Sequence, residues 1–140
     1  MKGTLVVIDP QKEFVRLEGA VEVLEKIKVL LSDNSYSNVI ITKFENSILP
    51  GYEIKEPELL VEEGKALVLS HGGYNCIPQS AIDSLQEPFY LVGFDTDACV
   101  MSTALHLVES KKEVFVMQDY CHSKLHDEAI KILKRNIKVI

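Results

Sequence analysis

Short apolar runs alternate with amphipathic segments along most of the chain. Each run is rich in β-branched residues and is bounded by polar or turn residues, which is typical of strands buried on both faces of a sheet. Five runs are clear, namely Thr4–Ile8, Asn38–Thr42, Ala66–Leu69, Phe89–Val92 and Val114–Met117. A sixth strand is possible at Ile137–Ile140. The pattern predicts a sheet of five to six strands.

Helical spacing of apolar residues separates these runs. It predicts helices over about Ala20–Ser32, Asp97–Lys111 and Lys124–Arg135, and a shorter helix starting at Pro78. The apolar face of the last long helix is expected to consist of Leu125, Ala129, Ile132 and Leu133. Buried strands that alternate with helices form βαβ units, so the predicted fold is three-layer α/β/α with a mostly parallel sheet.

Length and charge narrow the class of protein. A chain of 140 residues with 46% hydrophobic and 26% charged residues is expected to form a single domain over residues 1–140. Its 21 acidic against 15 basic residues give a net charge of −6, which argues against nucleic acid as a partner. No apolar run approaches the roughly 20 residues of a membrane span, and the first residues lack a cleavable-signal pattern. We expect a cytoplasmic protein without membrane contact.

The chain offers two further features of interest, one long loop and three cysteines. Residues Phe44–Gly64 contain Pro50, Gly51 and Pro57 and predict a surface excursion, either functional or merely solvated. The cysteines are widely spaced with no CxxC pair, so neither a disulfide framework nor a zinc knuckle is indicated.

Ligands of open α/β sheets bind at the carboxyl ends of the strands, so the residues after each predicted strand are the candidates for a site. They are Asp9, Lys43, Ser70, His71, the segment Asp95–Cys99, Asp119, Cys121 and His122.

Cys99 and Asp9 are the strongest of these candidates. Capping by Thr96 or Asp97 would place Cys99 in the first helical turn, where the helix dipole favours a thiolate. The alternative is a small buried residue without chemistry, and for Cys76 and Cys121 this structural interpretation is preferred. Asp9 lies at the mouth of the sheet, as a general base beside the thiol or as a simple turn residue.

Two motifs resemble those of the isochorismatase-like cysteine hydrolases. Val6–Phe14 is similar to their opening motif, an apolar strand followed by Asp-x-Gln-x-x-Phe. Leu91–Ala104 resembles their second motif, Gly-x-x-Thr-Asp-x-Cys-Val followed by Thr-Ala. The resemblance runs essentially end to end and implies a Rossmann-like fold and hydrolysis of a small amide or related C–N bond.

The resemblance also implies roles for individual residues. Asp9 would be the general base and Cys99 the nucleophile that forms a thioester. A cis peptide would join Phe94 to Asp95, with the N–H groups of Asp95 and Cys99 binding the oxyanion. Phe14 and Tyr74 would contact a small-molecule substrate, no cofactor is implied, and a homo-oligomer is expected.

One residue of the family pattern is replaced. The family has a triad lysine at the end of the third strand, where this chain has His71, or Ser70 if the register slips by one. Two replacements are conceivable, Lys43 reaching across from the neighbouring strand or His71 forming a Cys-His pair with Cys99. His71 could supply the charge of the lysine only when protonated. The alternatives are a catalytically impaired homologue that binds a small molecule or serves assembly, and a thiol-redox role for Cys99.

The metal site of the nicotinamidase branch is not expected in this chain. The resemblance places that site after the second strand, where it needs an Asp-x-His pair and a further His. The segment Thr42–Asn46 contains no histidine.

Overall fold

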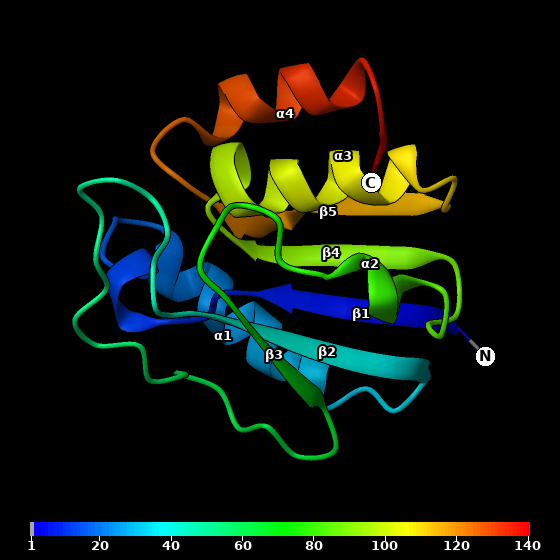
Figure 1. Ribbon diagram of the computed structural model, residues 1–140, viewed down its shortest axis with the longest axis horizontal. Coiled ribbons are helices and arrows are strands. Elements are labelled where there is room, and N and C mark those ends of the chain that lie inside the picture. The colour runs from blue at the N-terminus through cyan, green and yellow to red at the C-terminus, as the bar shows by residue number, and fades with distance from the viewer. Residues whose placement is uncertain (1) are drawn as a thin grey trace.

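A six-stranded parallel sheet forms the centre of the computed structural model, which describes residues 2–140. The strand order is β3-β2-β1-β4-β5-β6, and Figure 1 labels β1 to β5 in the sheet. The strands are β1 (Lys2–Ile8), β2 (Tyr36–Phe44), β3 (Leu67–His71), β4 (Phe89–Phe94), β5 (Val114–His122) and β6 (Lys138–Val139). All neighbouring strands pair in parallel, so the predicted sheet is confirmed.

Helices cover both faces of this sheet. Helix α1 (Ala20–Leu31) packs on one face through Ala20, Val23, Leu24 and Ile27. The other face is covered by α2 (Gln79–Ile82), α3 (Met101–Glu109) and α4 (His126–Lys134). Two short turns complete the elements, a 3-10 turn at Lys12–Phe14 and a π-helical turn at Thr96–Val100 directly before α3. Figure 1 shows α1 and α3–α4 on opposite sides of the sheet. The predicted three-layer α/β/α architecture is therefore confirmed.

Two local predictions need correction. The strand β5 runs on to His122, because its pairing with β4 shifts register after Leu91 and resumes with Gly93 opposite Cys121. Cys121 and His122 therefore end the strand instead of following it.

The buried face of α4 is also rotated from the predicted one. It consists of Ala129, Ile130 and Leu133, whereas Leu125 and Ile132 are each 51% exposed. The helix starts at His126, one residue after Leu125, and Ile130 joins the core in place of Ile132.

The long excursion between β2 and β3 is tied back to the end of β1 by one side chain. Gln11 Nε2 donates to the carbonyl oxygens of Phe44 (2.9 Å) and Pro57 (2.7 Å), and its Oε1 accepts from Phe44 N–H (2.9 Å). Gln11 and Leu59 also form an antiparallel bridge. The excursion therefore lies against the carboxyl ends of the strands.

Among residues 2–140, none of the helices combines the length and the apolar character that crossing a bilayer requires.

Candidate active site

Asp9 occupies a buried position directly after β1. Its side chain is 0% exposed, and its backbone has a positive φ of 48°, a conformation that aspartate tolerates better than most residues. Thr42 on β2 fixes it twice, since the Thr42 hydroxyl accepts from Asp9 N–H (3.1 Å) and donates to Asp9 Oδ1 (2.7 Å). The other oxygen, Oδ2, is buried and has no hydrogen-bond partner within the described chain.

His71 ends β3 and faces Asp9. Its Nε2 lies 2.7 Å from Asp9 Oδ1, and its Nδ1 lies 2.8 Å from the carbonyl oxygen of Gly73. Both partners are acceptors, because Oδ1 already accepts from Thr42. Both ring nitrogens therefore carry protons, and His71 is an imidazolium paired with the Asp9 carboxylate.

The pKa of His71 agrees with this hydrogen-bond pattern. Burial alone lowers the pKa of His71, but the hydrogen bond to Asp9 and the contact with Cys76 outweigh burial and raise it to about 10. The ring of Phe44 packs edge-on against the imidazole at 5.3 Å between centroids and screens it from water.

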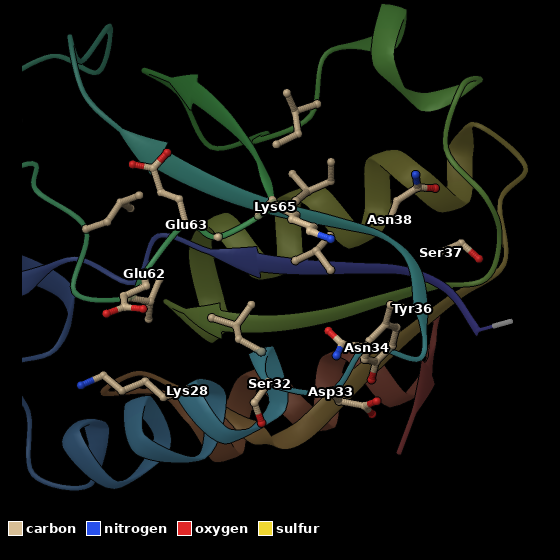
Figure 2. Close-up of a pocket in the computed structure, with 18 of the residues that line it drawn as sticks. Lys28, Ser32, Asp33, Asn34, Tyr36, Ser37, Asn38, Glu62, Glu63 and Lys65 are labelled. Carbon is tan, nitrogen blue, oxygen red and sulfur yellow. The ribbon is translucent and has the colours of Figure 1, made fainter.

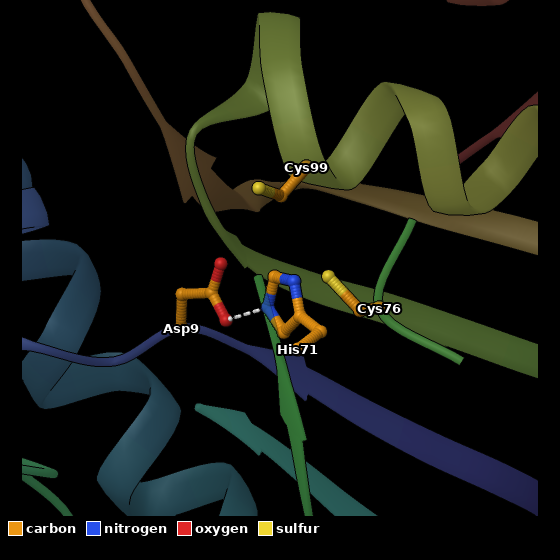
Figure 3. Close-up of side chains that lie close together, drawn as sticks. All are labelled: Asp9, His71, Cys76 and Cys99. Carbon is orange, nitrogen blue, oxygen red and sulfur yellow. Dashed lines mark hydrogen bonds and ion pairs between the residues drawn. The ribbon is translucent and has the colours of Figure 1, made fainter. Parts of the chain in front are cut away.

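Two thiols complete the cluster. Cys99 comes from the π-helical turn after β4, and Cys76 comes from the loop after β3. One donor atom from each of Asp9, His71, Cys76 and Cys99 lies within 4.8 Å of those of the other three. Figure 3 shows the bonded oxygen of Asp9 turned to His71 and the other oxygen turned toward the side of Cys99. We call these four residues the buried cluster.

The two thiols of the buried cluster titrate as a pair. Burial raises the pKa of Cys76, but contacts with Cys99 and His71 lower it to about 7. The contact with Cys76, then burial and the Asp9 charge, raise the pKa of Cys99. One proton therefore leaves the pair readily and the second is held.

Asp95 stands beside this cluster at the end of β4. The Phe94–Asp95 peptide is cis, as the motif resemblance implies. Burial, then the charges of Asp97 and Asp9, raise the pKa of the Asp95 carboxyl to about 6.

Capping before α3 differs from expectation. Asp95 is the N-cap of the π-helical turn, and no side chain caps it. The Thr96 hydroxyl instead lies 2.7 Å from Nδ1 of His126 on α4, so this hydroxyl joins two helices.

The remaining predicted residues lie around the cluster or apart from it. Lys43 belongs to the same strand as Thr42 but points to the opposite face, because strand side chains alternate, and its Nζ pairs with Glu45 at 3.4 Å. Phe14 packs edge-on against Phe44 at 6.0 Å. Tyr74 is 52% exposed. The structure thus brings Asp9, His71 and Cys99 together and leaves Lys43 outside.

Sequence position did not reveal three residues of the site, namely Thr42, Cys76 and Tyr52. Cys76 lies in the loop after β3, five residues beyond the last strand residue His71, and this closeness to a strand end was the available signal for it. Tyr52 comes from the excursion and packs edge-on against Phe44 at 5.5 Å. Burial, then the charges of Glu13, Asp95, Cys99 and Asp9, raise the pKa of Tyr52, and its side chain is 39% exposed. A cavity of about 490 Å³ adjoins it, lined by Ser47, Leu49, Gly51, Tyr52, Glu53 and Lys55.

A larger groove lies elsewhere on the molecule. Its volume is about 1270 Å³, and it runs between the end of α1, the first half of β2 and residues 59–67 (Figure 2). None of the four cluster residues lines it. The groove lies at the amino ends of the strands, whereas the four cluster residues lie at the carboxyl ends, where ligands of such sheets bind. The reactive groups, and not the size of the cavity, therefore indicate the candidate site.

The fold and the site together define a class of protein. It is an α/β/α protein with a parallel sheet that carries acid–base and nucleophilic groups, namely a carboxylate, an imidazolium and thiols, at the carboxyl ends of its strands. A sequence model of the Isochorismatase domain matches residues 4–140. The chain therefore belongs to the isochorismatase-like hydrolase family. A search of curated proteins gives no match.

Solved structures of this family share the fold. An isochorismatase-like hydrolase from Alkaliphilus metalliredigens is 16% identical with a TM-score of 0.83, over 100% of this chain and 94% of that one. The nicotinamidase PncA from Bacillus subtilis is 17% identical with a TM-score of 0.81, over 99% of each chain. An N-carbamoylsarcosine amidase from Thermoplasma acidophilum is 18% identical with a TM-score of 0.73, over 99% of this chain and 95% of that one.

Proposed function

We propose that this protein hydrolyses a small amide or related C–N bond through a thioester on Cys99, with Asp9 as general base. One observation carries the proposal. Asp9 uses Oδ1 for Thr42 and His71, while Oδ2 is buried without a hydrogen-bond partner in the described chain and is turned toward the side of Cys99 (Figure 3). A buried carboxylate oxygen left free beside a thiol is what proton abstraction requires.

The proposed reaction begins with transfer of the Cys99 thiol proton to Asp9 Oδ2. The sulfur then attacks the carbonyl carbon, and the new oxyanion accepts hydrogen bonds from the N–H groups of Asp95 and Cys99. Asp9 returns the proton to the nitrogen, the amine leaves and a thioester remains. Water, deprotonated by Asp9, hydrolyses the thioester and releases the acid and the thiol. Because its pKa is raised, Cys99 needs this base.

His71 takes the place of the family's triad lysine in this proposal. Its imidazolium pairs with Asp9 at 2.7 Å and so orients the carboxylate. Lys43, the other candidate, pairs with Glu45. His71 is thus a positioning residue, whose charge does what an ammonium would do at the same point.

The substrate class follows from the family and from the walls of the site. The similar structures include a nicotinamidase and an N-carbamoylsarcosine amidase, which supports a small carbonyl–nitrogen substrate. Phe14, Tyr52 and Tyr74 are the aromatic side chains proposed to contact it. A homo-oligomer and a cytoplasmic location remain predictions.

The decisive experiment is a screen of small primary amides and carbamoyl compounds with the reduced protein in excess chelator, scored by ammonia release. We expect turnover, and a loss of about 1000-fold or more in Cys99→Ala. Peptide mapping of a quenched reaction should find the acyl group on Cys99. Cys121→Ala is the matched control, because Cys121 is a buried thiol outside the cluster. Acylation of Cys76 alone would overturn the assignment of the nucleophile.

Variants of the two candidate cations test the role of His71. We expect His71→Ala to lower kcat by about 100-fold, His71→Lys to restore much of it, and Lys43→Ala to leave kcat within about twofold. Inactive Lys43→Ala beside active His71→Ala would identify Lys43 as the displaced lysine. If no compound turns over, the alternative of a catalytically impaired homologue that binds a small molecule or serves assembly is favoured.

A further inference from the structure

The buried cluster contains one more reactive group than amide hydrolysis uses. Asp9, His71 and Cys99 account for the proposed reaction, whereas Cys76 has no part in it. Yet the Cys76 side chain is 1% exposed and its sulfur lies among the other three donor atoms. Its only hydrogen-bond acceptor outside the cluster is the carbonyl oxygen of Tyr74, at 3.6 Å, among residues 2–140.

The four donor atoms are those of a zinc site. Two sulfurs, one imidazole nitrogen and one carboxylate oxygen are ligands that Zn²⁺ takes in tetrahedral sites. Zinc–ligand distances of about 2.0–2.3 Å place the donors of a tetrahedral site about 3.3–3.8 Å apart. The four donor atoms lie within 4.8 Å of one another, so no distance between two of them exceeds that of a bound site by more than about 1.5 Å.

Two observations point to a ligand beyond this proximity. Asp9 Oδ2 is fully buried without a hydrogen-bond partner in the described chain, a costly state for a carboxylate oxygen, and a cation would satisfy it. His71 donates from Nδ1 to the carbonyl oxygen of Gly73 at 2.8 Å, which is the outer contact that fixes a zinc-binding histidine with Nε2 turned to the metal. Thr42 fixes the Asp9 carboxylate in the same way.

We propose that Asp9, His71, Cys76 and Cys99 bind one Zn²⁺ ion in a closed tetrahedral site. On binding, Nε2 of His71 and both thiols release their protons, and Zn²⁺ replaces the imidazolium as the positive partner of Asp9. Three anionic ligands against the dication leave a net charge of −1. All four positions are held by protein, so the site has no open position to activate water.

Zinc binding and acylation exclude each other, because both need the Cys99 sulfur. The metal-bound protein is therefore inactive as a hydrolase, and removal of zinc exposes the nucleophile. This consequence rests on the proposed function, whereas the metal site itself does not.

The experiment uses Co²⁺ and Zn²⁺ with the full chain, reduced and freed of metal. Tetrahedral Co²⁺ with thiolate ligands has a sulfur-to-metal charge-transfer band and strong visible bands, so we expect both on titration and their loss when one equivalent of Zn²⁺ is added. Competition with a chromophoric chelator gives the zinc affinity. These readouts do not depend on hydrolysis, so an inactive enzyme would not affect them.

Variants decide which thiols take part. We expect Cys76→Ala to lower zinc affinity by more than about 100-fold, beyond the loss typical of an outer contact, and His71→Lys to abolish the visible bands while keeping the positive charge. Cys121→Ala should leave both unchanged. Circular dichroism verifies that each variant is folded. Absence of the charge-transfer band, or an unchanged band in Cys76→Ala, would overturn the proposal.

Discussion

Replacement of Asp95 by asparagine is expected to stabilise the protein at neutral pH but not in acid. Burial, together with the charges of Asp97 and Asp9, raises the pKa of this carboxyl from 3.8 to about 6. The folded state therefore binds a proton more tightly than the unfolded state does. Stability is fully present below pH 4 and falls as the pH rises through 6, since ionisation is disfavoured only in the folded chain.

The size of the effect follows from the shift. A difference of about two pKa units corresponds to about 3 kcal/mol. Because Asp95 is only partly buried, solvent screening reduces this to about 1–2 kcal/mol. Asparagine has nearly the same shape and no charge, so it removes this cost. The free energy of unfolding of Asp95→Asn relative to wild type should rise by about 1–2 kcal/mol between pH 4 and pH 7.

Urea denaturation in reductant at several pH values measures this difference. The pH dependence of the difference is the result that matters, because any packing change from the substitution is constant with pH. Glu109→Gln is the control, since it removes an exposed carboxylate from α3. If the difference in the free energy of unfolding between Asp95→Asn and wild type stays flat from pH 4 to pH 7, or falls, the folded state does not raise the pKa of Asp95 and the reasoning is refuted.

Three further predictions concern the frame of the site. Thr42→Val should lower the free energy of unfolding in urea by about 1–3 kcal/mol, because both hydrogen bonds to Asp9 are lost; Thr42→Ser should recover most of it. Gly93→Ala should cost more than about 3 kcal/mol by the same assay, since its Cβ would lie 2.2 Å from Ile8 O at a φ of +122°, and a loss below 1 kcal/mol would contradict this clash. Gln11→Ala removes two hydrogen bonds to Phe44, the residue before the excursion, and one to Pro57 within it, so limited proteolysis within 45–66 should accelerate at least about tenfold, whereas unchanged cleavage would show that Gln11 is not the clamp.

Much of the fold could be predicted because its signals are local. Apolar runs rich in β-branched residues, such as Thr4–Ile8, favour strands covered on both faces, and such strands require helices on both sides of a parallel sheet. The boundaries of elements that depend on distant partners were harder to predict from the sequence. The end of β5 at His122 follows from a register shift against β4, and no local signal at Gln118–Tyr120 indicates that the strand continues beyond it.

The site was predictable only at the ends of single strands. Asp9, His71 and Cys99 each follow or end a strand, and the rule for parallel sheets brings such residues together. Cys76 and Tyr52 enter from loops, whose paths depend on contacts such as those of Gln11 and Phe44. Side chains alternate between the two faces along β2, so Lys43 points away from the face of Thr42. The sequence alone does not show which of the two faces Asp9, and the hydrogen bond from Thr42 to Asp9 settles it.

The histidine at the position of the family's lysine has two chemical consequences that an ammonium lacks. An imidazolium can pair with Asp9 as lysine would, but once deprotonated it becomes a metal ligand, and a lysine ammonium donates only. Cys76 is the residue that makes this second state accessible, because it supplies the fourth ligand. A closed zinc site needs both His71 and Cys76, whereas the proposed hydrolysis needs only the His71–Asp9 pair beside the Cys99 nucleophile. His71→Lys therefore separates the two proposals in one variant, since it keeps the charge that orients Asp9 and removes the nitrogen that binds the metal.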